Sequence, residues 1–216
     1  MAADDGPCGD GDGHLVSVTP WTVKFWLPDG SGLPVTVTTG LLAGEPVIRT
    51  LDPAIVIPPG SSRLLNLFVK QSVLQVPPRA IVQLSIDGTP VFWGPATVVP
   101  AVDSPGAGPF DRDRDALERV TVVGGEQLLK DSIVESRLIE ENTDVATIAH
   151  DLCDLYAHPA LTVSALNFPV VGAVLSVFYR PEGTLYDALR VLTESVPGGA
   201  ACWVDALGEI HFQALT

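Results

Sequence analysis

The stretch AIVQLSIDGTPVFWG, residues 80–94, carries the clearest local pattern in this chain of 216 residues. Apolar side chains at the even positions from 80 to 86 alternate with others, which is the period of a half-buried β-strand. Asp87 and Gly88 follow, and such a pair adopts the positive φ angles that a tight hairpin turn requires. The sequence therefore predicts a β-hairpin here, and Gly94 permits a bulge or a bend where its second strand leaves the sheet.

Similar short apolar runs separated by turn residues continue on both sides of this hairpin, from His14 to about Val102. Such spacing is typical of antiparallel β domains. The segment 103–118 combines Pro, Gly and alternating charges, and we expect a surface loop there. The predicted strands are Thr22–Trp26, Val35–Thr39, Ala54–Ile57, Arg63–Val69, Ala80–Asp87, Pro90–Val99 and Arg119–Val123.

The pattern changes after Ser136, where apolar residues recur every three or four positions. One helix is predicted to begin at Asn142 or Thr143 and to end before Pro159. A second begins at Thr184, whose hydroxyl is expected to cap it together with Asp187. Three further elements are predicted: a short helical turn at Glu126–Lys130 and a closing hairpin of Ala201–Val204 and Glu209–Phe212.

These patterns predict a β-dominated α+β chain with three parts. Residues 1–13 are acidic and rich in glycine, so we expect a flexible tail. Residues 14–135 form the antiparallel β domain. Residues 136–216 form a small α/β domain with two helices and a C-terminal hairpin.

Composition excludes several classes of function. The formal net charge is −14, and the lysines Lys24, Lys70 and Lys130 form no basic patch, so binding to phosphate backbones is not expected. No apolar stretch approaches the roughly 20 residues of a membrane helix, so we predict no membrane span. The three cysteines contain no CxxC pair, and neither a zinc site nor a disulfide framework is predicted.

Candidate catalytic and metal-binding residues are better explained by structural roles. His150 and Asp151 resemble a phosphohydrolase dyad, but the additional ligands of that site are not evident. The aspartates at 111, 113 and 115 alternate with arginines that offset their charge, so a metal site is not favoured. His158 precedes Pro159, and we expect its imidazolium to complement the helix dipole. No catalytic, cofactor-binding or metal-binding residue is predicted.

The order of the segments resembles that of bacteriophage tail hub proteins, also called baseplate hub proteins. PPGSSRLLNLFVKQSVLQVPPRAIVQLSIDGTPVFWGPATVV is similar to the core of a hub domain, and VTVVGGEQLL is similar to its returning strand and short turn. DVATIAHDLCDLY and RPEGTLYDALRVLTESVPGG are similar to the two helices. ACWVDALGEIHF is similar to the closing hairpin, and the whole resemblance covers approximately residues 54–216.

The resemblance implies a tail-tube-like antiparallel β-barrel or sandwich with an appended α/β domain. It implies a structural virion protein, assembled in the host cytoplasm, that closes the distal end of the tail tube without catalysing a reaction. The implied partners are other copies of the chain in a homotrimer, the tail tube protein, distal tail or baseplate proteins, and a central spike or tip protein. DNA would meet it only during passage through the lumen, which the acidic charge suits.

Other functions stay open at this point. The chain holds one tube-like domain where hubs usually hold two, so a distal tail ring protein of hexameric symmetry is an alternative. A carbohydrate-binding or adhesin-like module using exposed tryptophans is another, and a peptidoglycan hydrolase fragment is a third. If the protein assembles, the interface residues that we predict lie in the hairpin and in the charged loop: Asp87, Gly88, Trp93, Asp111, Arg112, Asp113 and Arg114.

Overall fold

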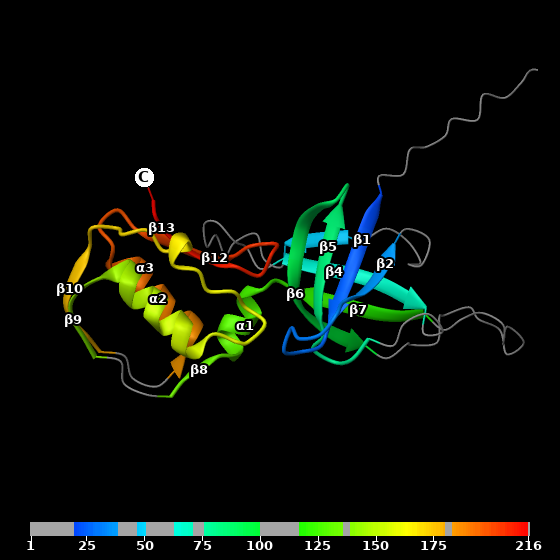
Figure 1. Cartoon of the computed structure of the whole chain (residues 1–216), viewed down its shortest axis with the longest axis horizontal. Coiled ribbons are helices and arrows are strands. Elements are labelled where there is room, and N and C mark those ends of the chain that lie inside the picture. Colours follow the sequence, from blue (N-terminus) through cyan, green and yellow to red (C-terminus); the bar gives the residue numbers. More distant parts are fainter. Residues whose placement is uncertain are drawn as a thin grey trace, which may run out of the picture.

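The computed structural model describes residues 20–38, 47–50, 63–70, 76–99, 117–135, 139–179 and 183–215. Two units lie side by side along its long axis, a β-sheet at one end and helices with short strand pairs at the other (Figure 1). The sheet contains β1 (Trp21–Trp26), β2 (Val35–Thr38), β3 (Val47–Thr50), β4 (Arg63–Lys70), β5 (Ile81–Ile86), β6 (Thr89–Val99) and β7 (Leu117–Val123). The second unit contains α1 (Glu126–Asp131), β8 (Ile133–Val134), β9 (Ile139–Asp144), α2 (Val145–Tyr156), the 3-10 helix η1 (Ala165–Asn167), β10 (Val174–Tyr179), β11 (Gly183–Thr184), α3 (Leu185–Ser195), β12 (Ala200–Val204) and β13 (Ile210–Ala214).

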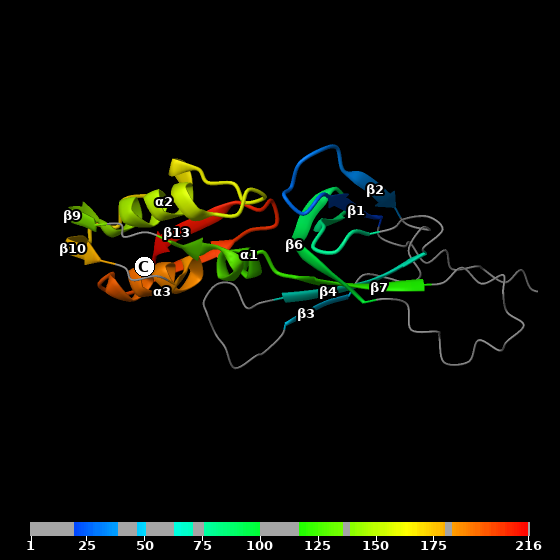
Figure 2. The ribbon, with the colours of Figure 1, turned by 90° about the horizontal axis from the view of Figure 1, so that it is seen from below.

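The seven strands of the first unit form one antiparallel sheet in the order β2-β1-β5-β6-β7-β4-β3. The 11-residue strand β6 pairs with β5 from Thr89 to Pro95 and with β7 from Ala96 to Val99. Figure 2 shows the result, with β1 and β2 on one side of β6 and β3, β4 and β7 on the other. The partner of β6 therefore changes between Pro95 and Ala96, next to Gly94, and the strand remains in the sheet. The predicted bulge or bend at Gly94 stays a prediction.

The fold class is confirmed as β-dominated, with a large antiparallel sheet and three α-helices among the described residues. In the described strand order, β2 and β3 are the two outermost strands and do not pair with each other. Closure of the sheet into a barrel therefore stays a prediction.

The hairpin at residues 80–94 forms as predicted. Asp87 and Gly88 connect β5 to β6 with φ angles of 51° and 77°. The pairing register shifts between Leu84 and Ser85, which identifies a β-bulge in the hairpin. The sequence missed strand β3, whereas the predicted strand at 54–57 and the tail at 1–13 lie outside the described residues. So does the predicted loop up to residue 116, but its last two residues, Leu117 and Glu118, begin strand β7, which starts two residues earlier than predicted.

Strand β5 differs from the prediction because both of its faces are buried. Ala80, Val82 and Leu84 point into a first core that lies between the two halves of the sheet. Gln83 and Ser85, on the face expected to be half exposed, are also buried. The second unit covers this face at Gln83, which donates a hydrogen bond to Ala206, and at Ile81, which belongs to the second core. The first core comprises Trp21, Val23, Phe25, Val37, Leu65, Leu67, Val76, Ala80, Val82, Leu84, Phe92, Ala96, Val120 and Val122.

A second core joins the helices to the hairpin β12–β13. Its largest fully buried residues include Leu152 of α2, Leu189 of α3 and Phe212 of β13. Among the described residues, the first core ends at Val122, and the second core begins at Leu128 apart from Ile81 and Trp93 of the sheet. The predicted domain boundary at residue 135 stays a prediction. None of the helices in the described ranges is long and apolar enough to cross a membrane.

The cap of helix α2 is Asp144, one or two residues later than the predicted start at Asn142 or Thr143. Residues up to Asp144 continue strand β9, and the carboxylate of Asp144 caps the helix by accepting a hydrogen bond from the backbone N–H of Ala146 at 2.9 Å. The same carboxylate accepts one from the N–H of Gly172 at 2.9 Å. The carboxylate of Asp144 therefore accepts hydrogen bonds from backbone N–H groups at the start of α2 and in the loop that precedes β10.

Thr184 caps α3 as predicted. Its hydroxyl oxygen accepts a hydrogen bond from the N–H of Asp187 at 3.1 Å, and its O–H donates to the carboxylate of Asp187 at 2.7 Å. We expect Thr184→Ala to lower the free energy of unfolding by about 1 kcal/mol, measured by urea denaturation, because it removes this cap. Thr193→Ala in the same helix is the control, with an expected effect below about 0.5 kcal/mol. Equal losses in the two variants would contradict the capping role.

Candidate functional site at the seam between the two units

The two units meet along a seam, defined here by Trp26, Ile81, Gln83 and Trp93 of the sheet and the residues of the second unit that they contact. Trp93 is the central residue of this seam. Its neighbour Phe92 points into the first core, so Trp93 points out of the sheet and joins the second core. Only 7% of Trp93 is exposed.

Two glycines of the second unit make room for the ring of Trp93. A Cβ atom at Gly208 would lie 2.7 Å from the ring, and one at Gly125 would lie 2.9 Å from it. Such distances are shorter than carbon atoms tolerate, so both positions require glycine. Gly208 also has a φ of 81°, so both its backbone conformation and its contact with the Trp93 ring favour glycine.

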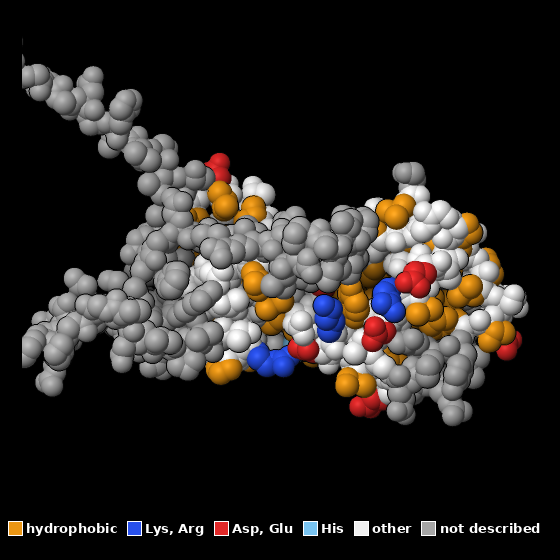
Figure 3. All heavy atoms as spheres, turned by 180° about the vertical axis from the view of Figure 1, so that it is seen from behind, with side chains coloured by type: hydrophobic (Ala, Val, Ile, Leu, Met, Phe, Trp, Pro, Cys, Tyr) orange, Lys and Arg blue, Asp and Glu red, His pale blue; other side chains and the backbone are white. Residues whose placement is uncertain are grey.

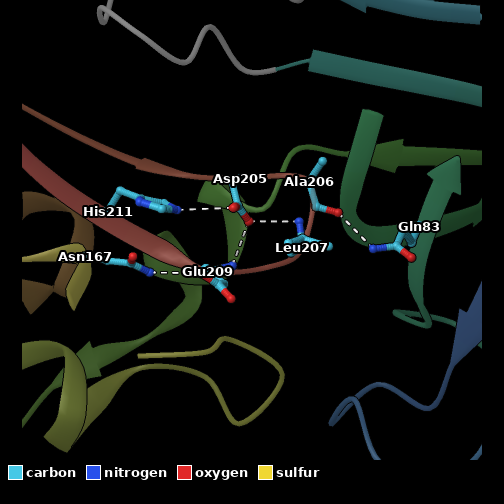
Figure 4. Close-up of polar contacts among 7 residues, drawn as sticks. All are labelled: Gln83, Asn167, Asp205, Ala206, Leu207, Glu209 and His211. Atoms are coloured by element: carbon cyan, nitrogen blue, oxygen red, sulfur yellow. Dashed lines mark hydrogen bonds and ion pairs between the residues drawn. The ribbon is translucent and has the colours of Figure 1, made fainter. Parts of the chain in front are cut away.

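Polar contacts extend the seam beyond Trp93. The side-chain amide of Gln83 donates a hydrogen bond to the carbonyl oxygen of Ala206 at 2.9 Å (Figure 4). Arg79 forms an ion pair with Asp131 at the end of α1. The position of Gly30, in the β1–β2 loop, is so close to Ala160 that a Cβ there would lie 2.9 Å from it. Three separate segments of the sheet unit therefore contact the second unit.

The turn between β12 and β13 contributes Ala206 and Gly208 to the seam. Asp205 organises this turn, because its Oδ1 accepts hydrogen bonds from the N–H groups of Leu207 at 2.8 Å and Glu209 at 2.9 Å. The hairpin over residues 201–212 was predicted, and this arrangement explains why aspartate and glycine occupy the ends of its turn.

Three side chains gather beside this turn, and the sequence analysis did not single them out. His211 Nε2 lies 3.1 Å from Asp205 Oδ2, and one Oε atom of Glu209 accepts a hydrogen bond from the amide of Asn167 at 3.0 Å (Figure 4). The ring of His211 stacks on that of Trp203, with centroids 5.0 Å apart and planes inclined by 8°. Single ligand atoms from Asp205, Glu209 and His211 lie within 4.8 Å of one another, so this trio is the place where described residues could hold a metal ion.

His158 lies close to the seam and differs from its prediction. Its Nδ1 accepts a hydrogen bond from the N–H of Ala160 at 3.2 Å, which requires that nitrogen to be unprotonated. Burial lowers the pKa of His158, and the charge of Arg79 lowers it further, against the opposite effects of Asp131 and Asp29. The prediction that the ring of His158 is charged is therefore wrong at neutral pH, because a ring nitrogen that accepts a hydrogen bond must be unprotonated.

This environment predicts a dependence of stability on pH. Since folding lowers the pKa of His158, its contribution is complete above the ordinary value of 6.5 and is lost as the pH falls below it. His158→Asn keeps an oxygen acceptor for the N–H of Ala160 but cannot be protonated. We expect the free energy of unfolding, measured in urea between pH 7.5 and 5, to fall less in the variant than in the unmodified chain. Parallel pH profiles would contradict this role.

The predicted interface residues lie in different environments. Asp87 and Gly88 are exposed at the tip of the hairpin, whereas Trp93 already has its neighbours within the chain, which leaves little of it for another subunit. The residues at 111–114 lie outside the described ranges. His150 is half-buried, and its ring packs edge to face on Phe168. The intersubunit role of Asp87, Gly88 and Trp93 stays a prediction.

Comparison with known proteins gives no match to a family model and no match among curated proteins. Among solved structures, the chain is similar to the prophage MuSo2 43 kDa tail protein from Shewanella oneidensis. The TM-score is 0.54 at 14% sequence identity, and the match covers 92% of this chain. This chain shares its fold with a phage tail protein.

The similarity to the Shewanella protein extends over both units, because the matched 92% of this chain is more than either unit alone contains. A tail protein from Neisseria meningitidis MC58 is also similar, with a TM-score of 0.49 at 16% identity over 89% of this chain. The chain spans 56% of the length of the Shewanella protein and 50% of that of the Neisseria protein.

Proposed function

We propose that this chain is a structural component of a phage tail, acting as a hub at the distal end of the tail tube and connecting the tube to the spike or tip. The observation that carries the proposal is the fold shared with the Shewanella tail protein across 92% of the chain. The β-sheet and the helical unit are matched together, and the order of their segments was the basis of the predicted resemblance. The role depends on protein contacts and requires no catalysis.

The open order of the described sheet supports a role in assembly. Strands β2 and β3 end the sheet, and an outermost strand presents unpaired backbone groups that a neighbouring chain can pair with. Val35 and Thr36 of β2 are exposed at that edge. A closed ring of copies covers such edges, because each copy contributes one edge to each neighbour. The sheet thereby becomes part of a barrel in the assembled trimer.

Inside the virion, the proposed partners are the tail tube protein, distal tail or baseplate proteins and a central spike or tip protein. The net charge of −14 suits a lumen through which DNA passes without being held. Assembly would take place in the host cytoplasm, before the tail is complete.

The tryptophans disfavour the carbohydrate-binding alternative. That function requires exposed aromatic rings, but Trp21 and Trp93 are 6% and 7% exposed. Trp26 packs against the second core, and Trp203 stacks on His211. All four rings have neighbours within the chain, and none belongs to the exposed class of side chains.

Solution mass tests the proposed function. Light scattering coupled to size-exclusion chromatography is expected to give a trimer whose mass is constant over a hundredfold range of concentration, with rings visible in negative stain. A stable hexamer would instead support the distal ring protein. A monomer at all concentrations, or a monomer that binds glycans, would exclude the hub.

The hairpin tip provides a matched pair of variants. Gly88 and Gly172 have φ angles of 77° and 72°, and a Cβ at either position would contact nothing within 4 Å. Valine therefore introduces a similar backbone strain, on the order of 1–3 kcal/mol, at both positions. We expect Gly88→Val to reduce the fraction of trimer and Gly172→Val to leave it unchanged, measured by the same light scattering. Equal effects would remove the hairpin tip from the interface.

A further inference from the structure

We propose that Asp205, Glu209 and His211 form a binding site for a divalent transition metal such as Zn²⁺. The site goes beyond the proposed tail function and does not depend on it, because it rests on side chains of the hairpin β12–β13 alone. Two carboxylates and one imidazole are a ligand set that suits Zn²⁺ and its neighbours in the first transition series.

The geometry of the hairpin brings the three ligands together. Asp205 begins the turn, Glu209 ends it, and His211 follows on β13 two residues later, on the same face of the strand as Glu209. One ligand atom from each residue lies within 4.8 Å of the other two. Asp205 Oδ2 and His211 Nε2 are already 3.1 Å apart, which is close to the separation of two ligands on one zinc ion.

Each ligand is held by a group outside the trio or by the backbone. Asp205 uses Oδ1 for the two N–H groups of the turn, which leaves Oδ2 facing His211. The amide of Asn167 orients Glu209. Stacking on Trp203 fixes the ring plane of His211. Support of this kind lowers the cost of ordering ligands around an ion, as hydrogen-bonded groups around known metal sites do.

The charge of the site favours a cation. Among the ion pairs of the described residues, Asp205 has only His211 as a partner and Glu209 has no lysine or arginine. The side chains of Asp205 and His211 are 28% and 20% exposed, so water screens their charges only in part. A metal ion would take the place of the proton between Oδ2 and Nε2 and would neutralise both carboxylates.

Three protein ligands leave at least one position on a tetrahedral ion for water or for a group from another molecule. The site lies next to the seam, because Ala206 and Gly208 of the same turn contact Gln83 and Trp93. A bound ion would therefore stiffen the turn that carries the second unit's contacts with the sheet.

The test is a titration of the full, untagged chain with Zn²⁺ in metal-free buffer at neutral pH, followed by calorimetry and by the NMR signals of the histidine rings. We expect one site of unit stoichiometry, with the largest shifts at His211. Glu209→Gln, which retains an acceptor for Asn167, and His211→Gln are expected to weaken binding at least about tenfold, the size of effect seen on altering ligand environments. Circular dichroism and urea unfolding establish that both variants fold.

The matched controls are Glu194→Gln, an exposed residue paired with Arg190 on α3, and His150→Gln, a half-buried histidine beside Asp151. Both are expected to bind Zn²⁺ as the unmodified chain does. Absence of binding would overturn the proposal. So would binding that folded Glu209→Gln and His211→Gln variants retain, or that His150→Gln loses, because the ion would then be bound adventitiously elsewhere. None of these results bears on the solution mass that tests the tail function.

Discussion

Gly94→Ala is expected to prevent the chain from reaching its folded state. A Cβ atom at this position would collide with the carbonyl oxygen of Val123 and would lie 3.0 Å from the carbonyl carbons of Val123 and Gly124. These are backbone atoms of the strand that β6 joins at this point, so no side-chain rotation relieves the collision. We expect the loss to exceed about 4 kcal/mol, a size reserved for severe core disruption.

Far-UV circular dichroism, heteronuclear NMR dispersion and the yield of soluble protein measure the effect of Gly94→Ala. Gly32→Ala is the control, because Gly32 also occurs in the sheet unit but has open space around it. Its φ of 81° makes some strain unavoidable, and we expect a loss of about 1 kcal/mol with normal spectra. A folded Gly94→Ala variant with the stability of the control would show that β6 can change partners without the close approach seen here.

Trp93→Ala is expected to lower the free energy of unfolding by about 3–5 kcal/mol, the range for removing a large buried aromatic side chain. The ring lies against both Gly125 and Gly208 and fills the space beside them. Because the ring of Trp93 anchors the sheet to the second core, we also expect faster proteolysis between the units. Urea unfolding and limited digestion measure the two effects, and Leu33→Ala, at a side chain 95% exposed, is the control.

A double-mutant cycle isolates the contact between Trp93 and Gly208. Gly208→Ala introduces both a strained φ and a collision with the ring, but only the strain remains once Trp93 is alanine. We therefore expect Gly208→Ala to cost less in the Trp93→Ala background than alone, with a coupling of about 1 kcal/mol or more. Strict additivity of the two losses would contradict the packing described for the seam.

Local signals in the sequence predicted the elements that depend on neighbouring residues. The alternation before Asp87 and the Asp-Gly pair itself were enough for the hairpin, because strand period and turn conformation are set within about ten residues. Thr184 and Asp187 predicted the start of α3 for the same reason, since a cap joins residues three positions apart.

These local patterns did not predict the contacts between segments that are far apart in the sequence. The alternation of β5 predicted one exposed face, but Gln83 is buried because a turn 123 residues later in the chain covers it. For Trp93 the local pattern predicted only an interface role, which stays a prediction, and did not indicate that the ring packs into the second core of its own chain. Nothing in the local pattern states which unit packs on which face of a sheet.

The trio at the β12–β13 turn was missed for a related reason. Asp205, Glu209 and His211 follow no familiar metal-ligand spacing, and they converge only because a four-residue turn reverses the chain between them.

The cap of helix α2, Asp144, was also not predicted from the sequence. Asn142 and Thr143 are equally good candidates for a helix cap, and only the pairing of β9 with β10 continues the strand past them.

The continuity of β6 determines how the sheet unit would respond to mechanical force. Its first half is held by β5 and its second half by β7, so one covalent strand carries load from either half of the sheet to the other. A pull along β6 would have to break the hydrogen bonds on both sides together, in shear, instead of opening them one at a time. Trp93 lies on this same strand, so part of any force on the helical unit would pass into the sheet through β6.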